Sequence, residues 1–516
     1  MIVFETILVM LAMAVLLLAV ARRLLLPYPV LLAIAGAAIA IAPVDVGFHL
    51  DPSLALALFV APVLLDAAYD TSLRDLKRHW MPVTSLVLIA VGLTTVSVAW
   101  VVHMLVPTTP WAAAIAIGAI VAPPDAVAAT TVLRDVKLPH RVAVILEGEA
   151  LLNDASALLI YRFAVAAVLA GGSISAEAIA PAFLLSLVGS ILAGPAFAWL
   201  TGQVTGRIKD VPSSIIVQFI STYGVWVIAE RLGMSPILTM VSYAMTMARL
   251  MPAHLPAQLR IPSYAVWETA VLVLNVLAFL LIGLELGPTI AAAGPGELGR
   301  WAKVGAAVLV TVIVVRLLWT LAAALWAQWR IRRGAVAAPG GGPLPGWRTG
   351  LIIGWAGTRG LVTVATALAL PQDFPERGML LFAAFSVTLG TLLIQGLTLR
   401  PLVRALDVGD DEPIDREVRE ARVATAEAAL AALKEEVSED AARLRVELNA
   451  ERVVAEGADE GDGRPTFPVK LLRSKTVAAR RERLLELRRD GVIGDGAFHR
   501  LEQELDLADL VLTART

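Results

Sequence analysis

The stretch with the densest potential chemistry is Glu147-Gly148-Glu149-Ala150-Leu151-Leu152-Asn153-Asp154, where three carboxylates and one carboxamide fall within eight residues. The segment that follows it, residues 155–161, is mainly apolar. If this segment crosses a bilayer, the acids lie at or near hydrocarbon depth. A charge at that depth is costly, so an intramembrane acid indicates a functional site.

Two acids of this stretch point to different neighbours if the stretch is helical. Glu149 and Asp154 are five residues apart, which is about 140° around a helix. Asn153 shares a face with Glu149, four residues before it. The simplest assignment gives Glu149 an arginine partner as a structural ion pair. Asp154 then binds a cation or a proton in turn, because a carboxylate in a partly dry site is costly without one of them.

The composition indicates a membrane protein. Of 516 residues, 58% are hydrophobic and 17% are charged, and the mean hydropathy is +0.74. A soluble domain is about half apolar and about a quarter charged. The net charge of -2 argues against a nucleic-acid partner, and the absence of cysteine excludes disulfides and thiolate sites. The N-terminus lacks the basic region of a signal peptide, so the first apolar run is expected to be retained.

Apolar runs separated by polar breaks predict an all-α polytopic membrane protein with about 13 transmembrane helices. They lie at about 3–20, 28–43, 53–70, 83–106, 111–130, 142–168, 178–203, 212–230, 235–250, 263–287, 302–327, 349–370 and 378–399. The second run is short and the break between the eighth and ninth is brief, so twelve or fourteen spans are alternatives.

The distribution of basic residues predicts the orientation. Lys and Arg favour cytoplasmic loops. Eighteen basic residues fall in the odd-numbered connections and four in the even-numbered ones. This alternation would be lost if one span were missed, so it supports thirteen spans with the N-terminus outside and the C-terminus in the cytoplasm.

The composition changes sharply after about residue 405. We therefore divide the chain into a transmembrane domain, 1–405, and a cytoplasmic helical tail, 406–516. The tail reads as an Ala/Glu/Arg-rich helix over 415–456, a polar linker over 457–468 and two short charged helices over 471–512. We interpret it as a solvated or dimer-contacting element without a specific ligand site.

Several charged residues are expected inside or at the ends of spans. The fifth span contains Pro123 and Pro124 directly before Asp125, which predicts a broken helix and leaves the carbonyls of Val121 and Ala122 available as cation ligands. Acids near predicted span ends, such as Glu230, are expected at the interface. The embedded bases, each of which needs a partner, are Arg162, Arg316 and Arg359.

A second interrupted helix is predicted in the twelfth span. Its sequence, Gly354-Trp355-Ala356-Gly357-Thr358-Arg359-Gly360, has three glycines around an arginine and admits close backbone approach. Paired breaks in the two halves of a transporter are typical of inverted repeats with a site at the midplane. We therefore expect the fifth and twelfth spans to be discontinuous helices that cross at their breaks.

The sequence resembles the monovalent cation:proton antiporter family, in the bacterial NhaP-like sodium/proton exchanger branch. The resemblance covers about residues 1–405 and rests on five motifs in order. They are residues 58–69 (LFVAPVLLDAAY), 123–128 (PPDAVA), 147–154 (EGEALLND), 357–360 (GTRG) and 391–402 (TLLIQGLTLRPL).

The resemblance implies a homodimer whose core domain moves against a dimerisation domain in elevator-type alternating access. It implies Asp154 as the carrier of cation and proton, Asn153 beside it, and Asp125 as the acid of the unwound helix. It places the buried Glu–Arg pair on Glu149 with Arg359, or with Arg316 as second candidate. The acid of the third-helix motif falls on Asp66. Members with Asn before the Asp are generally electroneutral.

Two departures bear on selectivity. Pro124 replaces a hydroxyl residue common before the unwound-helix acid, and Ala150 replaces a serine. Sodium is the first expectation from the resemblance, and because of these two departures potassium and lithium stay open as alternatives. The ligand set for the transported cation is Asp154 and Asp125 with the carbonyls of the broken helix, oxygen ligands that suit a hard cation.

The predicted function is a secondary antiporter of the cytoplasmic membrane, not an enzyme, without a cofactor beyond the transported cation and proton. A K⁺/H⁺ antiporter of the same fold is the first alternative. An intramembrane aspartyl protease with Asp125 and Asp154 as a dyad is a remote alternative, and a channel or non-transporting sensor is another. The expected partners are cations, protons, membrane lipid and a second copy of the chain.

Overall fold

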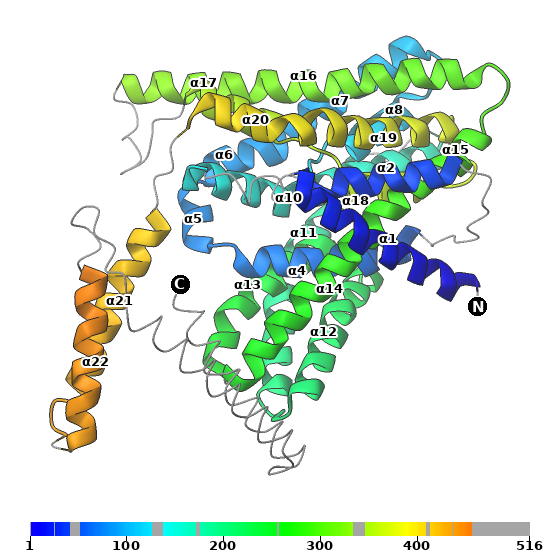
Figure 1. The fold of residues 1–516 in the computed structure, drawn as a ribbon. Coiled ribbons are helices and arrows are strands. Elements are labelled where there is room, and N and C mark those ends of the chain that lie inside the picture. Colours follow the sequence, from blue (N-terminus) through cyan, green and yellow to red (C-terminus); the bar gives the residue numbers. More distant parts are fainter. Residues whose placement is uncertain are drawn as a thin grey trace. The chain divides into compact units, whose positions relative to one another are not determined.

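The computed structural model describes residues 2–24, 26–41, 52–125, 138–171, 176–254, 257–333, 346–408, 413–436 and 438–456. Over these residues the chain is helical, with turns between the helices. It divides into two compact units, Met1–Asp411 and Glu412–Thr516. Figure 1 shows the elements in chain order.

The first half of the large unit leads to the helix that carries the opening acids. Its elements are α1 (Ile2–Leu24), α2 (Tyr28–Ile41), α3 (Pro52–Ala55), η1 (Leu56–Val60), α4 (Ala61–Asp70), α5 (Leu73–Arg78), α6 (Trp80–Thr84), η2 (Ser85–Ala90), α7 (Val91–Leu105), α8 (Trp111–Val121) and α10 (His140–Leu169). The three elements labelled η, including η3 below, are π-helical turns within longer helices, a local widening that is frequent at functional sites.

The second half of the large unit and the tail continue the helical pattern. The elements are α11 (Ala176–Thr205), α12 (Val211–Arg231), α13 (Pro236–His254), α14 (Ala257–Leu284), α15 (Leu286–Ala291), α16 (Glu297–Arg332), α17 (Trp347–Trp355), α18 (Leu361–Leu368), α19 (Arg377–Thr391), η3 (Leu392–Gly396), α20 (Leu397–Leu406), α21 (Pro413–Ala432) and α22 (Glu439–Glu456).

The predicted polytopic all-helical fold is confirmed. Within the described ranges, seven helical segments are long and apolar enough to cross a membrane. Their outward side chains are apolar, as the 68% exposed Leu192 and the 65% exposed Ile220 show, which suits contact with lipid rather than water. Each of the thirteen expected spans contains helix in its described part, with non-helical breaks in the fifth and the twelfth, but the count of thirteen stays a prediction.

Glycines allow the helices around the site to approach closely. A Cβ atom on Gly36 of α2 would overlap the carbonyl oxygen of Leu280 in α14, and one on Gly283 of α14 would overlap the backbone of α2. Likewise, Gly118 of α8 packs on the carbonyl of Thr95 in α7. Such small-residue contacts are the usual means of close helix packing in membranes, and they fix α8 against its neighbours.

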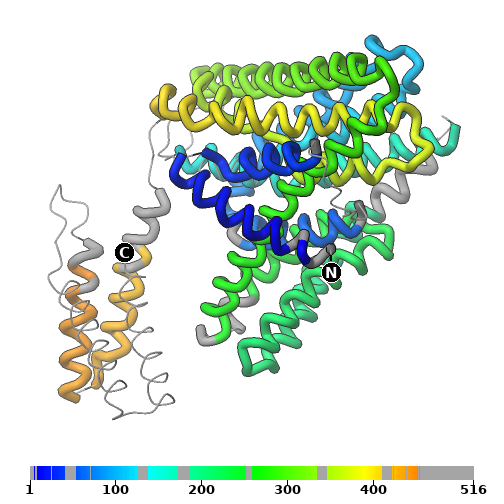
Figure 2. The backbone as a smooth tube through the Cα atoms, turned by 45° about the vertical axis from the view of Figure 1, so that its right-hand side comes forward, coloured from blue at the N-terminus to red at the C-terminus, as the bar shows by residue number. Residues whose placement is uncertain are grey.

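The long helices form two groups in the large unit. In both views, α16 runs alongside the continuous α19–η3–α20 helix, while α11, α12, α13 and α14 gather at the opposite side (Figures 1 and 2). The continuous α10 helix packs against α8 and also contacts α13 and α4. It therefore connects the broken helices to the second group.

Two helices of the tail are described. α21 and α22 pack against each other, with Ala426 and Ala441 buried between otherwise exposed faces. The charged helices expected over 471–512 lie outside the described residues. The second half of the fifth span, expected to follow Asp125, also lies outside them.

Candidate functional site

Two helices break where the sequence predicts breaks, and the breaks meet. α8 ends at Val121, before Pro123 and Pro124, because these prolines supply no N–H to continue it. The α17–α18 helix is open over residues 356–360. The backbone N–H of Asp125 donates to the carbonyl oxygen of Thr358 at 2.6 Å, so the two interrupted segments hold each other directly.

Arg359 lies at this crossing and is fully buried. Its Nε donates to the carbonyl oxygen of Val121 at 2.6 Å, and its Nη1 donates to the carbonyl oxygen of Gly357. Its backbone N–H donates to Thr391 Oγ1 at 2.9 Å. A single guanidinium group thus satisfies carbonyls that both broken helices leave without a helical partner.

Gly360 makes the close approach of Asp125 possible. A Cβ atom at residue 360 would overlap the carboxylate of Asp125. From the sequence, this glycine is expected only to weaken the helix, whereas in the structure it also leaves room for the side chain of Asp125. The carboxylate of Asp125 therefore packs against the start of α18.

Asn153 and Asp154 approach the crossing from α10. Asn153 is fully buried, and its Nδ2 donates to the carbonyl oxygen of Pro124 at 3.1 Å. Its Oδ1 is also buried and has no hydrogen-bond partner among the residues that the structure describes. Asp154 is 7% exposed, and the charges that act on it are those of Asp125 and Arg359. The unwound backbone and the two α10 side chains thus form one polar site.

Glu149 is held by Arg316, the second of the two arginines considered from sequence. Arg316 Nη1 and Nη2 donate to Glu149 Oε1 and Oε2 at 2.5 and 2.8 Å, and both side chains are almost fully buried. Arg316 Nη2 also donates to the carbonyl oxygen of Ile353 at 3.1 Å. The first choice, Arg359, was wrong because its guanidinium is already taken by backbone carbonyls at the crossing.

Five charged groups interact within this part of the molecule. Arg359 experiences the charges of Arg316, Glu149, Asp154 and Asp125. Three carboxylates against two guanidinium groups leave one net negative charge when all five are ionised. We call these five residues the charge cluster.

Three other predicted ligands have different surroundings. The carbonyl of Val121 accepts from Arg359, so in this structure a guanidinium takes the role predicted for a cation there. Ala122 is buried beside it. Asp66, in contrast to the buried Asn153 and Asp154, is exposed on α4. Over the described ranges, no cluster of three or more His, Asp or Glu side chains has a metal-binding arrangement.

Two contributors to the site were not identified from sequence. They are the carbonyl of Thr358 and the hydroxyl of Thr391. Both residues lie in motifs that carried the resemblance, so the motifs were the available signal. Their roles depend on which backbone groups the breaks expose, and spacing alone does not define this.

The comparisons agree with the geometry. The family described as "Sodium/hydrogen exchanger, transmembrane" matches residues 9–405. The chain is 29% identical to an uncharacterized Na⁺/H⁺ exchanger of Escherichia coli over 526 residues, with 94% of each chain covered. It is 30% identical to a sodium, potassium, lithium and rubidium/H⁺ antiporter of Bacillus subtilis over 393 residues, which cover 72% of this chain and 57% of the relative.

A solved structure shares the fold. The sodium proton antiporter MjNhaP1 from Methanocaldococcus jannaschii superposes with a TM-score of 0.60 at 17% identity, covering 79% of this chain and 98% of that chain. The predicted family is confirmed by the match over most of the sequence. The chain is a multi-pass membrane protein that belongs to the sodium/hydrogen exchanger family of monovalent cation:proton antiporters.

Proposed function

We propose that this protein exchanges one monovalent cation for one proton across the cytoplasmic membrane, with Asp154 as the group that binds them in turn. The observation that carries the proposal is the single net negative charge of the charge cluster. Binding of one cation or one proton neutralises this charge. Binding of both would leave one excess positive charge buried in the charge cluster, which is costly.

The charge cluster supports a division of roles. Glu149 and Arg316 neutralise each other in a bidentate pair, and Arg359 is held by backbone carbonyls. Asp154 is buried beside a second carboxylate, that of Asp125. Of the five groups, Asp154 is therefore the one whose ionised form depends most on a ligand, and protons compete with cations for it.

The ligand set we propose for the cation contains oxygen atoms only. The carboxylates of Asp154 and Asp125 contribute charge, and the buried Oδ1 of Asn153 and the carbonyl of Ala122 complete the set. Hard cations prefer such ligands. Sodium is the first choice, and potassium or lithium are alternatives because relatives from Bacillus are named as antiporters of several alkali cations.

We further propose a homodimer with elevator-type alternating access, an external N-terminus and a cytoplasmic tail. The basic residues of the odd-numbered connections support the orientation. The broken helices, α10 and their neighbours would move as a body that carries the charge cluster, since these elements are joined by the buried bonds described above. No resident cofactor is required by this scheme.

The test is proton flux in inverted membrane vesicles. Addition of Na⁺, K⁺ or Li⁺ should release protons from wild-type vesicles, and Asp154→Asn should abolish the response to each cation. Asp373→Asn, which changes an exposed acid in a loop, should behave as the wild type. Normal exchange by Asp154→Asn would refute the assignment. A clamped membrane potential should leave the equilibrium unchanged, and a shift would refute one-for-one exchange.

A further inference from the structure

A cavity of about 50 Å³ lies between α10 and residues of the second helix group, and its lining on α10 begins at Ala155. We call it the Arg162 cavity and define it by Ala155, Leu158, Arg162, Ser186, Glu230 and Ser235. Ala155 is the residue after Asp154, so the cavity begins one residue along α10 from the proposed carrier, although Asp154 is not among its lining residues. A water molecule needs roughly 10–15 Å³ measured in this way, so the cavity has room for several waters.

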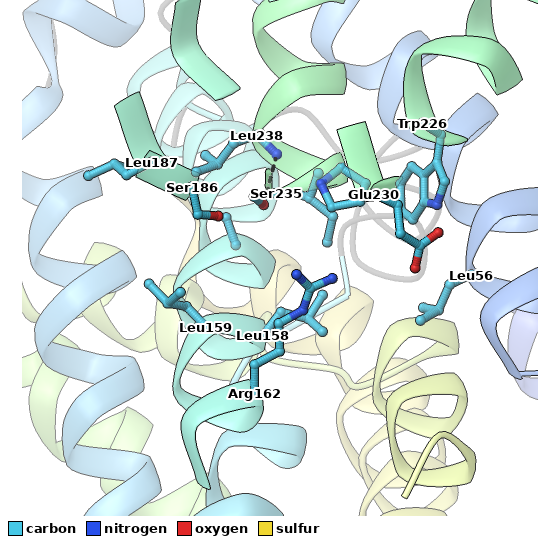
Figure 3. Close-up of a pocket in the computed structure, with 13 residues that line it drawn as sticks. Leu56, Leu158, Leu159, Arg162, Ser186, Leu187, Trp226, Glu230, Ser235 and Leu238 are labelled. Atoms are coloured by element: carbon cyan, nitrogen blue, oxygen red, sulfur yellow. Dashed lines mark hydrogen bonds between the residues drawn. The ribbon is translucent and has the colours of Figure 1, made fainter. Parts of the chain in front are cut away.

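The cavity brings two opposite charges together from different helices. Arg162 extends into it from α10, two helical turns beyond Asp154, and Glu230 extends into it from α12 (Figure 3). Eight residues of helix correspond to about 12 Å. Over the residues that the structure describes, no ion pair joins Arg162 to Glu230 or either of them to another side chain.

Arg162 and Glu230 line the cavity but are both exposed, and charges that lack a partner in a membrane protein require water or a change of position. The aliphatic side chains of the lining, such as Leu158 and Leu159, have no polar atom that could hydrogen-bond to either group. Ser186 and Ser235 add hydroxyl groups to the lining (Figure 3). The cavity is therefore suited to hydration and to a partial approach of the two charged side chains.

We propose that the Arg162 cavity is the external access route to Asp154, and that Arg162 and Glu230 form its gate. This inference rests on the exchange proposed above. When α10 is displaced relative to α12, the two side chains pair and close the route. When they separate, as here, Glu230 attracts the cation and water reaches Asp154. Glu230 precedes the α12–α13 turn, which is external in the proposed orientation.

The gate explains why a cation transporter carries an arginine on its route. When the two side chains are apart, the negative charge of Glu230 offsets the repulsion between the guanidinium of Arg162 and a cation, and when they pair they block the passage sterically. The sequence placed Glu230 at the interface and left Arg162 in need of a partner. The structure brings both to one cavity, at the boundary between the helix that carries Asp154 and the helices opposite it.

The chain contains no cysteine, so single cysteines can be introduced directly. Leu158→Cys and Ser235→Cys should react with a membrane-impermeant thiosulfonate added outside cells, and modification of Leu158→Cys should block exchange. Leu192→Cys, an exposed apolar position of α11 outside the cavity, should not react because a thiol in lipid does not ionise. Labelling only from the cytoplasmic side, or none at all, would refute an external route.

Charge reversal tests the gate itself. Arg162→Glu and Glu230→Arg should each slow exchange by about tenfold or more, and the double reversal should restore most of the rate, since contacting residues couple energetically. Wild-type rates in both single variants, or no recovery in the double variant, would refute the pair. If a charge-reversal variant fails to reach the membrane, the labelling of the Leu158→Cys protein still tests whether the Arg162 cavity opens to the outside.

The two proposals fail in different ways. If the wild-type protein releases no protons on addition of any alkali cation, the proposed exchange is wrong. If the wild-type protein exchanges normally and Asp154→Asn does not, but labelling and charge reversal have no effect, only the gate is wrong.

Discussion

Glu149→Gln should destabilise the protein and weaken its affinity for the cation, for two separable reasons. The substitution leaves the guanidinium of Arg316 buried without its carboxylate. Removing one partner of a buried ion pair costs about 3–5 kcal/mol. Because glutamine still offers an acceptor for one of the two bonds, we expect the lower value, about 3 kcal/mol, or roughly a 100-fold change in the folding equilibrium.

The effect on cation affinity follows from the lost charge. Glu149 and Asp154 are separated by five residues of helix and point to different faces, which places the carboxylates about 10 Å apart. At an effective dielectric constant of about 20, one charge at that distance contributes about 1.7 kcal/mol. The apparent KM for the cation should therefore rise by roughly 15-fold, because an ionised Asp154 then leaves the cluster neutral without a cation.

A double variant separates the two effects. Replacing Glu149 by Leu and Arg316 by Met removes both charges, so it should recover stability and also return the net charge and the KM toward the wild type. Arg300→Gln is the matched control, since it removes the Arg300–Glu376 pair, whose side chains are 45% and 24% exposed. An exposed pair contributes less than about 1 kcal/mol.

Thermal unfolding in detergent, followed by the fluorescence of the 12 tryptophans, measures the stability, and cation titration of proton flux measures the KM. If Glu149→Gln unfolds at the same temperature as Arg300→Gln, the buried pair does not stabilise the fold as argued. A KM that stays raised in the double variant would show that geometry, rather than net charge, sets the affinity.

Three further predictions address other contacts. Gly360→Ala should abolish proton flux, because its Cβ would displace the Asp125 carboxylate, whereas Gly92→Ala has open space around it and should retain full flux. Asn153→Ala removes the bond to the crossing and should raise the cation KM at least several-fold in flux titrations. Burial, together with nearby arginines, lowers the pKa of His79 below 6.5, so the unfolded chain binds more protons there. Unfolding temperatures should therefore fall as the pH drops through that value, less so in His79→Gln.

The breaks in the two helices could be predicted from sequence because their causes are local. Consecutive prolines remove hydrogen-bond donors wherever they occur, and glycines such as Gly357 and Gly360 weaken a helix and leave room for the side chains of Arg316 and Asp125, which a Cβ atom would overlap. The same holds for the divergence of Glu149 and Asp154, which follows from helical geometry alone. Each inference needed only the residues concerned.

The partner of Glu149 could not be predicted because it depends on the packing of separate helices. Arg316 and Arg359 are both arginines in predicted spans, and nothing in their spacing ranks them. The choice is decided by Gly357, where a Cβ atom would lie 2.5 Å from Cδ of Arg316. The absence of that side chain lets Arg316 pass to Glu149, while Arg359 turns toward Val121.

The position of Arg359 changes how the crossing of the two broken helices should be understood. Carbonyls exposed by a helix break are commonly regarded as cation ligands, and the sequence suggested this role for Val121. Here a fixed guanidinium satisfies that carbonyl, so the crossing is stabilised whether or not a cation is bound. The exchangeable ion is then needed only beside Asp154, where it can leave without unfolding the break. A carrier that must also exist in a proton-loaded, cation-free form benefits from this separation, because its scaffold does not depend on its cargo.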